Sequence, residues 1–547
     1  MKKRIFRGGF RTMMCAGSCL IPLVVCGQKP ISSGSEASSS LRAQVRRERS
    51  PKERDESMEK CYSIRSVKGP DGVEPQVGGL QALADGRIAA VFHHGQVGMY
   101  DEKRGRWSIF AEGLHEPLGI LQEVDGSFLV MQRPELTRLR DTAGKGKADW
   151  YRTVWDDFGM TGNYHEFSFG PVQGPNGKLY VGLNLASSGA SIRPEIRGKW
   201  MAVGLDRSAF APHWRETPTP EWREKTGVQA GRMYSRVPWR GWIMEIDPQT
   251  GKATPFASGF RSPDGLGFDA EGNLLVSDNQ GDWRGSSELH VVKKGGFYGH
   301  PASLPWQSGW DGTAPLEVSL ERLEALRTPA AVWFPHGTYA NSPTQMVQIP
   351  KTAVWGPYGG QMVIGEMNVA RLLRVTLERV DGMWQGACYP FVETSSLSAG
   401  LHRLAFSGDK LWVGRTHLSW AGGEHFCTVE PTGKTPFDPV EIRVSATGFR
   451  VHFTQPLSPE SAARELWPIS RYRYAYHKEY GSPELDKVTV TPESVTLGSD
   501  GLEAEVTLSE MPLDCVYDFD LQALRSREGE LLLNQKAAYT LRRRPQR

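Results

Sequence analysis

Short apolar runs separated by turn residues recur along most of the chain and follow one repeated pattern. In each copy, an apolar run leads into a Gly-containing turn, and a second apolar strand follows. Asp-Gly, Asn-Gly and Gly-Asn pairs between alternating apolar runs favour β-hairpins, because these residues tolerate the positive φ that such turns require. The six copies span residues 80–100, 113–133, 164–185, 260–280, 357–377 and 400–416.

Repeated antiparallel units at intervals of tens of residues are typical of solenoids and propellers, and the unequal spacing favours a propeller with inserted loops. We therefore expect an all-β fold with a six-bladed β-propeller over residues 59–430. Two insertions interrupt it, an Arg- and Trp-rich one at 187–240 and a second at 281–355. Long insertions in a compact repeat are usually functional loops, so we expect both to roof the central pocket.

The pattern changes after Thr432. Short alternating strands are expected at 440–453, 488–497, 502–508, 516–523 and 537–541, with turns at Thr447-Gly448 and Asp500-Gly501. They predict a small immunoglobulin-like β-sandwich over residues 431–547. A run of tyrosines predicts one more strand with an aromatic face, for packing or for carbohydrate binding; it comprises Tyr472, Tyr474, Tyr476 and Tyr480.

The N-terminus carries most of the basic excess. The net charge of the chain is +3, but residues 1–57 hold 12 Lys/Arg and 5 Asp/Glu. A basic start followed by a short apolar stretch predicts a signal peptide over residues 1–26 and export to the periplasm or cell surface. Cys26 and Cys19 each sit in a partial lipobox, so lipidation at either cysteine and simple secretion stay open. Residues 27–58 are polar and predict a disordered linker.

Charge and cysteine spacing exclude several function classes. Without its first 57 residues the chain is slightly acidic, which gives no electrostatic case for nucleic-acid binding. There is no CxxCH motif for c-type haem. The four cysteines after Cys26 allow either two disulfides or buried free thiols; they are Cys61, Cys388, Cys427 and Cys515.

Candidate catalytic groups recur at one offset within the repeat. His165 opens the third copy, Arg261 the fourth, and His402 and Arg403 the sixth. A histidine titrates near neutrality and can act as a general base, and an arginine can pair with an anion. If the segment is extended, Glu166 points to its other face, so Glu166 is not automatically the partner of His165.

Oxygen-rich residues at the end of the fourth copy predict a metal site. Asp278, Gly281 and Asp282 fall within a Ser-Asp-Asn-Gln-Gly-Asp run, which suits a hard cation such as Ca²⁺. A second loop, residues 141–149, has calcium-loop spacing. It carries Ala143 and Lys145 where carboxylates are needed, so we predict a metal-free turn there.

Two further segments bear a family resemblance. The run FRSPDGLGFDAEGNLLVSDNQGDW, followed by GGFYGHP, resembles the glucose/sorbosone dehydrogenase family of six-bladed propellers. The chain is similar above all to secreted propeller proteins of the "membrane-bound dehydrogenase" group of planctomycete-type bacteria. The motifs of that group occur here as QRPELTRLRDT, GNYHEFSFG, PWRGW, NSP and YGSPELD.

The resemblance implies pyrroloquinoline quinone above the central channel, together with Ca²⁺. It implies that His165 abstracts the proton of a sugar hydroxyl while a hydride passes to the quinone. Arg261 would be the active-site arginine, and Arg403, beside His402, would contact a carboxylate of the cofactor. Gly281 and Asp282 would offer backbone carbonyls to Ca²⁺.

The first hypothesis is therefore an exported sugar or polyol dehydrogenase of the sorbosone or aldose type, which passes its electrons to an acceptor protein. The second is a non-catalytic propeller that binds glycans or proteins, with its pocket blocked by Trp239 or His300. The third is a Ca²⁺-dependent lactonase, for which Asp278, Asn279 and Glu366 are the candidate ligands.

Overall fold

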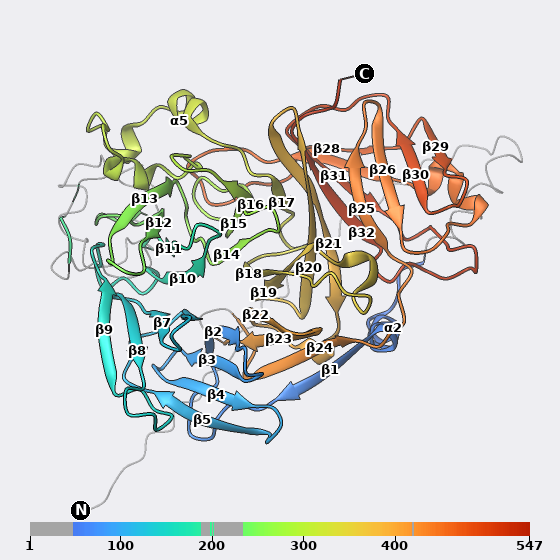
Figure 1. The fold of residues 1–547 in the computed structure, drawn as a ribbon. Coiled ribbons are helices and arrows are strands. Elements are labelled where there is room, and N and C mark those ends of the chain that lie inside the picture. Colours follow the sequence, from blue (N-terminus) through green and yellow to red (C-terminus); the bar gives the residue numbers. More distant parts are fainter. Residues whose placement is uncertain (1–46, 187–196, 200, 202–233, 418–420, 547) are drawn as a thin grey trace, which may run out of the picture. The chain divides into compact units, whose positions relative to one another are not determined.

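The computed structural model describes residues 47–186, 197–199, 201, 234–417 and 421–546. In this part of the chain, antiparallel four-stranded meanders form the six blades of a β-propeller (Figure 1). The predicted signal peptide and most of the 187–240 insertion lie outside the described residues.

The first three blades follow chain order. Blade 1 comprises β2 (Val77–Ala82), β3 (Ile88–Phe92), β4 (Val97–Asp101) and β5 (Arg106–Ala111). Blade 2 comprises β6 (Gly119–Gln122), β7 (Phe128–Met131), β8 (Leu136–Arg140) and β9 (Trp150–Trp155). Blade 3 comprises β10 (Ser168–Gln173), β11 (Leu179–Leu183), β12 (Trp242–Ile246) and β13 (Ala253–Ser258).

Blades 4 and 5 are also meanders. Blade 4 comprises β14 (Gly265–Phe268), β15 (Leu274–Asp278), β16 (Ser287–Val292) and β17 (Val332–Phe334). The connection from β16 to β17 holds η1 (Pro301–Trp306), η2 (Pro315–Glu317) and α5 (Leu320–Leu326). Blade 5 comprises β18 (Pro343–Gln348), β19 (Met362–Glu366), β20 (Arg371–Val380) and β21 (Met383–Glu393), with η3 (Gly356–Tyr358) before β19.

Blade 6 joins the two ends of the propeller. It contains β22 (Leu401–Ser407), which follows η4 (Ser395–Leu397), then β23 (Lys410–Arg415) and β24 (Phe426–Pro431). Its outer strand is β1 (Tyr62–Val67), which pairs antiparallel with β24 from Tyr62↔Pro431 to Val67↔Phe426. The ring is thus held shut by backbone hydrogen bonds between segments that are far apart in sequence.

Packing of blade on blade explains the apolar runs of the repeat. Every residue of β3, β11 and β15 is buried, because neighbouring blades cover both faces of a central blade strand. Strands buried on both faces have continuous apolar sequences instead of alternating ones. The repeat seen in the sequence is therefore the signature of the interior of the propeller.

The fifth predicted repeat was shifted by one strand. Residues 357–377 contain β19 and β20, the second and third strands of blade 5, whereas the inner strand is β18. The predicted 281–355 insertion was also wrong as a single loop, since β16, β17 and β18 lie inside it. β17 is only three residues long and β18 is partly exposed, so neither carries the apolar signature.

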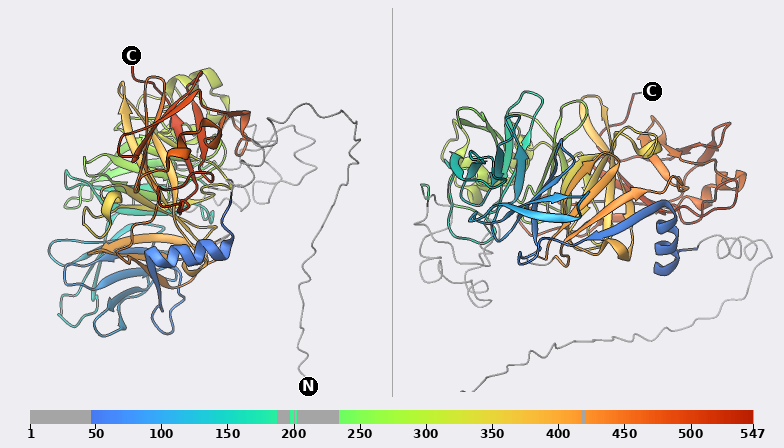
Figure 2. Two further views of the ribbon diagram at one scale, coloured as in Figure 1. Left: turned by 90° about the vertical axis from the view of Figure 1, so that its right-hand side faces the viewer. Right: turned by 60° about the horizontal axis from the view of Figure 1, so that its bottom comes forward.

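The predicted linker at 27–58 was wrong at its C-terminal end. Helix α2 (Pro51–Cys61) begins there with a capping box, in which the Ser50 hydroxyl accepts from the Glu53 N–H and the Glu53 carboxylate accepts from the Ser50 N–H. Met58 and Cys61 are buried in the core of blades 5 and 6. Figure 2 shows the helix leading directly into β1.

The C-terminal residues form two sheets with immunoglobulin strand order. One sheet has the order β25 (Pro439–Val444), β26 (Gly448–Phe453), β30 (Glu503–Thr507), β29 (Ser494–Leu497). The other has the order β32 (Lys536–Leu541), β31 (Cys515–Asp520), β27 (Ile469–Arg473), β28 (Leu485–Val490). These are the ABED and GFCC′ orders of the immunoglobulin fold. Two short helices, η5 (Pro459–Ala462) and η6 (Arg464–Leu466), precede β27.

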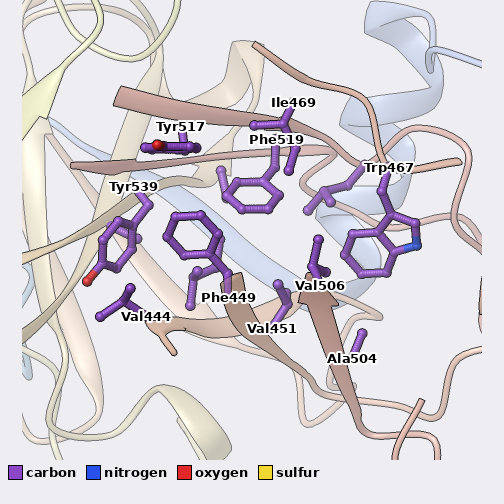
Figure 3. Close-up of a cluster of buried hydrophobic side chains, with 14 of the residues drawn as sticks. Val444, Phe449, Val451, Trp467, Ile469, Ala504, Val506, Tyr517, Phe519 and Tyr539 are labelled. Carbon is purple, nitrogen blue, oxygen red and sulfur yellow. The ribbon is translucent and has the colours of Figure 1, made fainter. Parts of the chain in front are cut away.

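The core of this domain lies between its two sheets (Figure 3). Phe449 projects from β26 and packs in tilted or edge-on contact with Tyr517, Phe519 and Tyr539 of the facing sheet, with ring centroids 5.1–5.4 Å apart. The Tyr517 hydroxyl donates to the carbonyl of Pro512 at 3.0 Å, as in the tyrosine corner of immunoglobulin domains.

The domain and the propeller share one continuous sheet. β32 pairs with β21, the outer strand of blade 5, at Gly386↔Thr540, Ala387↔Tyr539 and Cys388↔Ala538. Blade 5 therefore forms an eight-stranded sheet together with β32, β31, β27 and β28. No residue pattern in either strand signals this pairing.

The predicted tyrosine strand was also wrong. β27 ends at Arg473, so Tyr474, Tyr476 and Tyr480 lie in the loop that follows it. All four cysteines of the predicted propeller and sandwich are buried free thiols. No helix within the described residues is long and apolar enough to cross a membrane.

Candidate active site

His165 lies in the loop that enters blade 3. Its Nδ1 is 2.7 Å from the carbonyl oxygen of Leu185, which can only accept, so Nδ1 carries the hydrogen. The neutral imidazole then keeps its lone pair on Nε2, and His165 lines the central cavity. The backbone N–H of His165 donates to the side-chain oxygen of Asn163 at 3.0 Å, which fixes the loop locally.

Two buried arginines hold the backbone on either side of His165. Arg133 donates to the carbonyls of Asn163 and Tyr164 at 3.0 and 2.7 Å. Arg240 donates to the carbonyls of Glu166 and Phe167 at 3.0 and 2.9 Å. These guanidinium groups restrict the conformations open to the loop and so orient the imidazole.

Glu166 does not partner His165, and its carboxylate is held by other groups. One carboxylate oxygen accepts from the N–H and hydroxyl of Thr161, and the other accepts from the hydroxyl of Ser235 at 2.9 Å. Ser235 in turn accepts from the N–H of Ala186, one residue after the Leu185 that binds the imidazole. Glu166 therefore supports the site from behind.

The environment of His165 strongly disfavours its protonated form. Burial, followed by the charge of Arg261, lowers the pKa of His165 to about 3. Arg133 acts in the same direction, while the Leu185 carbonyl and Asp264 oppose it. The imidazole is thus neutral at physiological pH and is ready to accept a hydrogen bond.

Arg261 enters blade 4 beside the His165 loop. Its carbonyl accepts from the N–H of Leu185 at 3.1 Å, which joins the two blades next to the imidazole. The guanidinium lies 5.7 Å from the centre of the Tyr480 ring. It also packs on Gly281, where an added Cβ would stand 2.5 Å from Nε of Arg261.

The predicted calcium ligands do not form a cation site. Asp278 accepts from the N–H groups of Arg261 and Ser262 and pairs with Arg284 at 2.9 Å, so its oxygens are held by donors. The Gly281 carbonyl accepts from the N–H groups of Arg284 and Gly481, both at 3.1 Å. The described residues contain no group of three His, Cys, Asp or Glu suited to a metal. Asp278 and Gly281 do not fit Ca²⁺, because the Asp278 carboxylate is ion-paired and the Gly281 carbonyl already accepts two hydrogen bonds.

Asp282, the third predicted ligand, is buried, and its backbone bridges to that of Tyr480. The assignment from sequence failed here because it could not reveal a segment of the C-terminal domain beside residues 281–282. An oxygen-rich strand end that is hydrogen-bonded to a neighbouring backbone looks the same in sequence as one open to a metal.

His402 and Arg403 meet Asp264 at the centre of the propeller. The Arg403 guanidinium lies 2.9 Å from the Asp264 carboxylate, and it also donates to the carbonyl of Gly78 in blade 1. His402 Nε2 lies 3.4 Å from the same carboxylate, and its Nδ1 lies 2.8 Å from the carbonyl of Val77. Burial alone would raise the pKa of Asp264, but Arg403 and His402 hold it below its usual value.

Arg403, which was predicted to contact a cofactor carboxylate, is paired with a carboxylate of the protein. Its charge is balanced by Asp264, and its donors link blades 1, 2, 4 and 6 at the axis. His402, by contrast, lines the central cavity, as does His165. Burial and then Arg403 lower the pKa of His402, so it is neutral at physiological pH.

The cavity is small, with a volume of about 40 Å³, which suits a few water molecules or one edge of a larger ligand. Leu118, Phe167 and Phe169 form an apolar side. On the polar side, the side-chain oxygens of Asn184 and Asn279 are buried and have no hydrogen-bond partner among the described residues. Buried carbonyl oxygens are rarely left unpaired, so these two await donors from a ligand or water.

The sequence did not single out Asn184 or Asn279 as ligands of a substrate. Each follows an apolar strand of its repeat, at the end of β11 or β15, where a propeller places its pocket residues. This shared position in the repeat could have identified both asparagines from the sequence. Arg240 was noted only within a motif, and its contact with the His165 loop requires the fold.

Two other carboxylate-containing segments singled out in the sequence hold backbone N–H groups of loops. The Glu366 carboxylate accepts from the N–H groups of Asn341, Ser342, Asn368 and Val369, so it is no lactonase ligand. Within residues 141–149, the carboxylates of Asp141 and Asp149 accept backbone N–H groups of their own loop.

The two side chains expected to block the pocket lie elsewhere. Trp239 packs on Trp242, with ring centroids 5.6 Å apart. His300 caps η1 by accepting from the N–H of Ala302 at 3.2 Å. Neither is among the described residues that line the central cavity.

Three solved structures are among those similar to this chain. The aldose sugar dehydrogenase of Streptomyces coelicolor, in its PQQ-bound form, is 17% identical, with a TM-score of 0.44 over 68% of this chain and 98% of its own. A putative oxidoreductase (glucose dehydrogenase) from Thermus thermophilus is 17% identical, with a TM-score of 0.44 over 68% and 99%. The holo PQQ domain of pyranose dehydrogenase from Coprinopsis cinerea is 12% identical, with a TM-score of 0.42 over 68% and 96%.

Two family models match different parts of the propeller. Residues 70–232 match a domain of unknown function, DUF7133. No curated protein matches the sequence. Residues 224–387, which include Arg261, Asn279 and Tyr234, match the family described as Glucose / Sorbosone dehydrogenase. One part of the propeller, residues 224–387, is thus similar to the glucose/sorbosone dehydrogenase family.

Proposed function

We propose that this propeller is an oxidoreductase that oxidises a hydroxyl group of a sugar or polyol, with His165 as the proton acceptor. The observation that carries the proposal is the set of acceptors at the cavity. The side-chain oxygens of Asn184 and Asn279 are buried without a donor from the described residues, and the hydrogen bond at Nδ1 leaves His165 Nε2 with a lone pair to accept one. A polyhydroxylated neutral molecule supplies several donors at once.

In the proposed step, the proton and the hydride leave the substrate in different directions. One substrate hydroxyl donates to Nε2 of His165, while neighbouring hydroxyls donate to Asn184 and Asn279. The O–H proton moves to Nε2, the C–H hydrogen leaves as hydride, and the carbon–oxygen bond becomes a carbonyl. Leu185 accepts from Nδ1 throughout and so stabilises the imidazolium that forms.

In this proposal, a quinone cofactor would contact the site at one edge. Arg261 would hold one carboxylate of pyrroloquinoline quinone, whereas Arg403 stays paired with Asp264. The chemistry that the cofactor supplies, when bound, is acceptance of the hydride. A carboxylate bound at Arg261 offsets the charge that depresses the pKa of His165, so binding of an anion there would make His165 a stronger base.

The test starts from cofactor binding. Purified protein is titrated with pyrroloquinoline quinone by absorbance and calorimetry, and sugars are then screened with an artificial electron acceptor. His165→Gln should bind the quinone yet lose turnover by about 10²- to 10⁴-fold. The half-exposed surface residue His452 provides the control, and His452→Gln should behave as the wild type. A wild type that binds sugar without oxidising it would favour a non-catalytic glycan-binding propeller.

The proposal includes export, with the electrons passed to an acceptor protein at the periplasm or cell surface. It is based on the basic and apolar pattern of residues 1–26. Cell fractionation and metabolic labelling with a fatty acid test it. Label lost in Cys26→Ala, in Cys19→Ala or in neither separates lipidation at each cysteine from simple secretion. Recovery of the full-length chain from the cytoplasm would contradict export.

A further inference from the structure

The loop after β27, residues 474–484, reaches from the C-terminal domain to the propeller beside Arg261. We refer to it as the docking loop. Its backbone pairs with residues 281–285 of blade 4: Gly481 N–H donates to the Gly281 carbonyl at 3.1 Å, and Ser482 N–H donates to the Gly285 carbonyl at 2.8 Å. In the other direction, Trp283 N–H donates to the His477 carbonyl at 3.1 Å.

Side chains reinforce this pairing. The Tyr476 hydroxyl donates to the carbonyl of Gly299 at 2.6 Å, and its ring lies 5.2 Å from the ring of Trp283. Arg327 also stacks on Tyr476, with its guanidinium carbon 4.0 Å from the ring centre. The docking loop is therefore anchored at both blade 4 and the insertion that follows β16.

The docked backbone occupies the position at which the sequence predicted Ca²⁺. The Gly281 carbonyl, a predicted ligand, is bonded to Gly481, and the backbone of Asp282 bridges to Tyr480. Gly481 has a φ of +67°, and an added Cβ there would stand 2.8 Å from the side-chain nitrogen Nε2 of Gln280. Glycine adopts this left-handed backbone conformation without strain.

Tyr480 extends from the same loop over Arg261. The tyrosine is 42% exposed, while Arg261 beneath it is only 4% exposed. With Gly281 on one side and the Tyr480 ring on another, the guanidinium has few conformations left. A cation oriented in advance binds an anion at a lower entropic cost.

We propose that the C-terminal domain is a working part of the site: its docking loop takes the place of a metal ion in fixing residues 281–282, and Tyr480 positions Arg261 for an anionic group of the ligand. The ligand class rests on the proposed function; the metal-free docking does not. Tyr480 is a positioning residue, because it acts through Arg261.

The binding test uses the full-length chain and pyrroloquinoline quinone as the anionic probe. Tyr480→Ala should bind the probe about threefold to tenfold more weakly, and Tyr480→Phe should bind as the wild type does, because the ring is retained. Tyr151, on β9, is 44% exposed and makes a matched control, so Tyr151→Ala should leave binding unchanged. Unaltered binding in Tyr480→Ala would overturn the role of Tyr480.

Chelation tests the metal-free docking. Wild-type affinity for the probe should be the same in EDTA and in excess Ca²⁺. A loss in EDTA that Ca²⁺ reverses would overturn the proposal, because a metal would then be holding the loop.

Amide hydrogen exchange separates failure of the inference from failure of the proposed function. If the wild type binds no quinone, the quinone-dependent function fails, and the docking is judged from the amides of Trp283 and Gly481 alone. Slow exchange at both amides, unchanged by EDTA, supports metal-free docking. Rapid exchange, or protection that requires Ca²⁺, overturns it.

Discussion

The Nδ1 atom of His165 lies 2.7 Å from the carbonyl oxygen of Leu185, and this one hydrogen bond decides which imidazole nitrogen carries the hydrogen. The bond spans two ends of the hairpin formed by β10 and β11. Because a carbonyl cannot donate, Nε2 is left with its lone pair. The orientation of the candidate base is therefore set by the backbone of its own blade.

Acid sensitivity is the first prediction. The pKa of His165 falls from 6.5 to about 3 on folding, so between these values the unfolded chain binds a proton that the native state does not. Stability should fall as the pH decreases below 6.5, by up to about 1.4 kcal/mol for each pH unit from this group. His165→Gln should lose less stability than the wild type between pH 7 and pH 4.5 in urea denaturation.

A matched comparison isolates the effect, since other buried histidines titrate as well. His452 is a half-exposed residue of the C-terminal domain, and His452→Gln should keep the pH dependence of the wild type. Parallel stability curves for His165→Gln and His452→Gln would contradict the depressed pKa of His165.

Arg261 should control the basicity of His165. Its charge is the second cause of the low pKa, after burial, so Arg261→Met should raise the pKa of His165. Arg261→Lys keeps a positive charge and should leave the value low. The measurement is an NMR titration of labelled histidine side chains, with His165 assigned by its loss in His165→Gln. An equal pKa of His165 in Arg261→Met and Arg261→Lys would show that Arg261 does not act on His165 through its charge.

Arg240 should stabilise the loop that carries His165. It is fully buried and donates to the carbonyls of Gly159, Glu166 and Phe167. Burial lowers the pKa of Arg240 to about 10, so it stays charged at neutral pH. Arg240→Met leaves those carbonyls without a donor and should cost at least about 3 kcal/mol in denaturant unfolding.

The control for Arg240 is another arginine, at the surface. Arg322 pairs with Asp311 in an exposed ion pair, and Arg322→Met should cost less than about 1 kcal/mol. Comparable losses in the two variants would contradict the role assigned to Arg240.

The C-terminal domain and the propeller should unfold together. They share the sheet in which β21 pairs with β32, so opening one domain exposes the edge of the other. Phe449 fills the core of the C-terminal domain, and Phe449→Ala should cost about 3–5 kcal/mol. Calorimetry should show a single transition at a lower Tm. Two transitions, of which only one moves, would show that the domains are independent.

Much of the propeller could be predicted because its signal is local. The buried central strands leave continuous apolar runs next to glycine turns, as at Ile88–Phe92 and Leu274–Asp278. The prediction failed for β18, which is partly exposed, and for β17, which has three residues. A short or half-exposed strand has too few apolar positions to stand out from a loop.

The candidate site was predicted only in part. The cavity brings together His165 and His402, whose shared offset in the repeat was visible in the sequence. Arg403 has that offset too, but it is paired with Asp264. The repeat fixes which strand end a residue occupies, whereas the partner of a charged side chain depends on a different blade.

By itself, the sequence determined the class of fold, the number of blades and the presence of a second β-domain, because hairpin turns and apolar strands depend on neighbours in the chain. The tertiary structure alone decided that Gly481 bonds to Gly281, that Tyr480 covers Arg261, and that Asp278 faces Arg284 instead of a cation. The first two of these contacts join segments that are about 200 residues apart in the sequence. Every non-proline residue has a backbone N–H and every residue a carbonyl, so a backbone hydrogen bond cannot be recognised from residue types. Packing of the C-terminal domain on the propeller therefore turned a predicted calcium site into a junction between two domains.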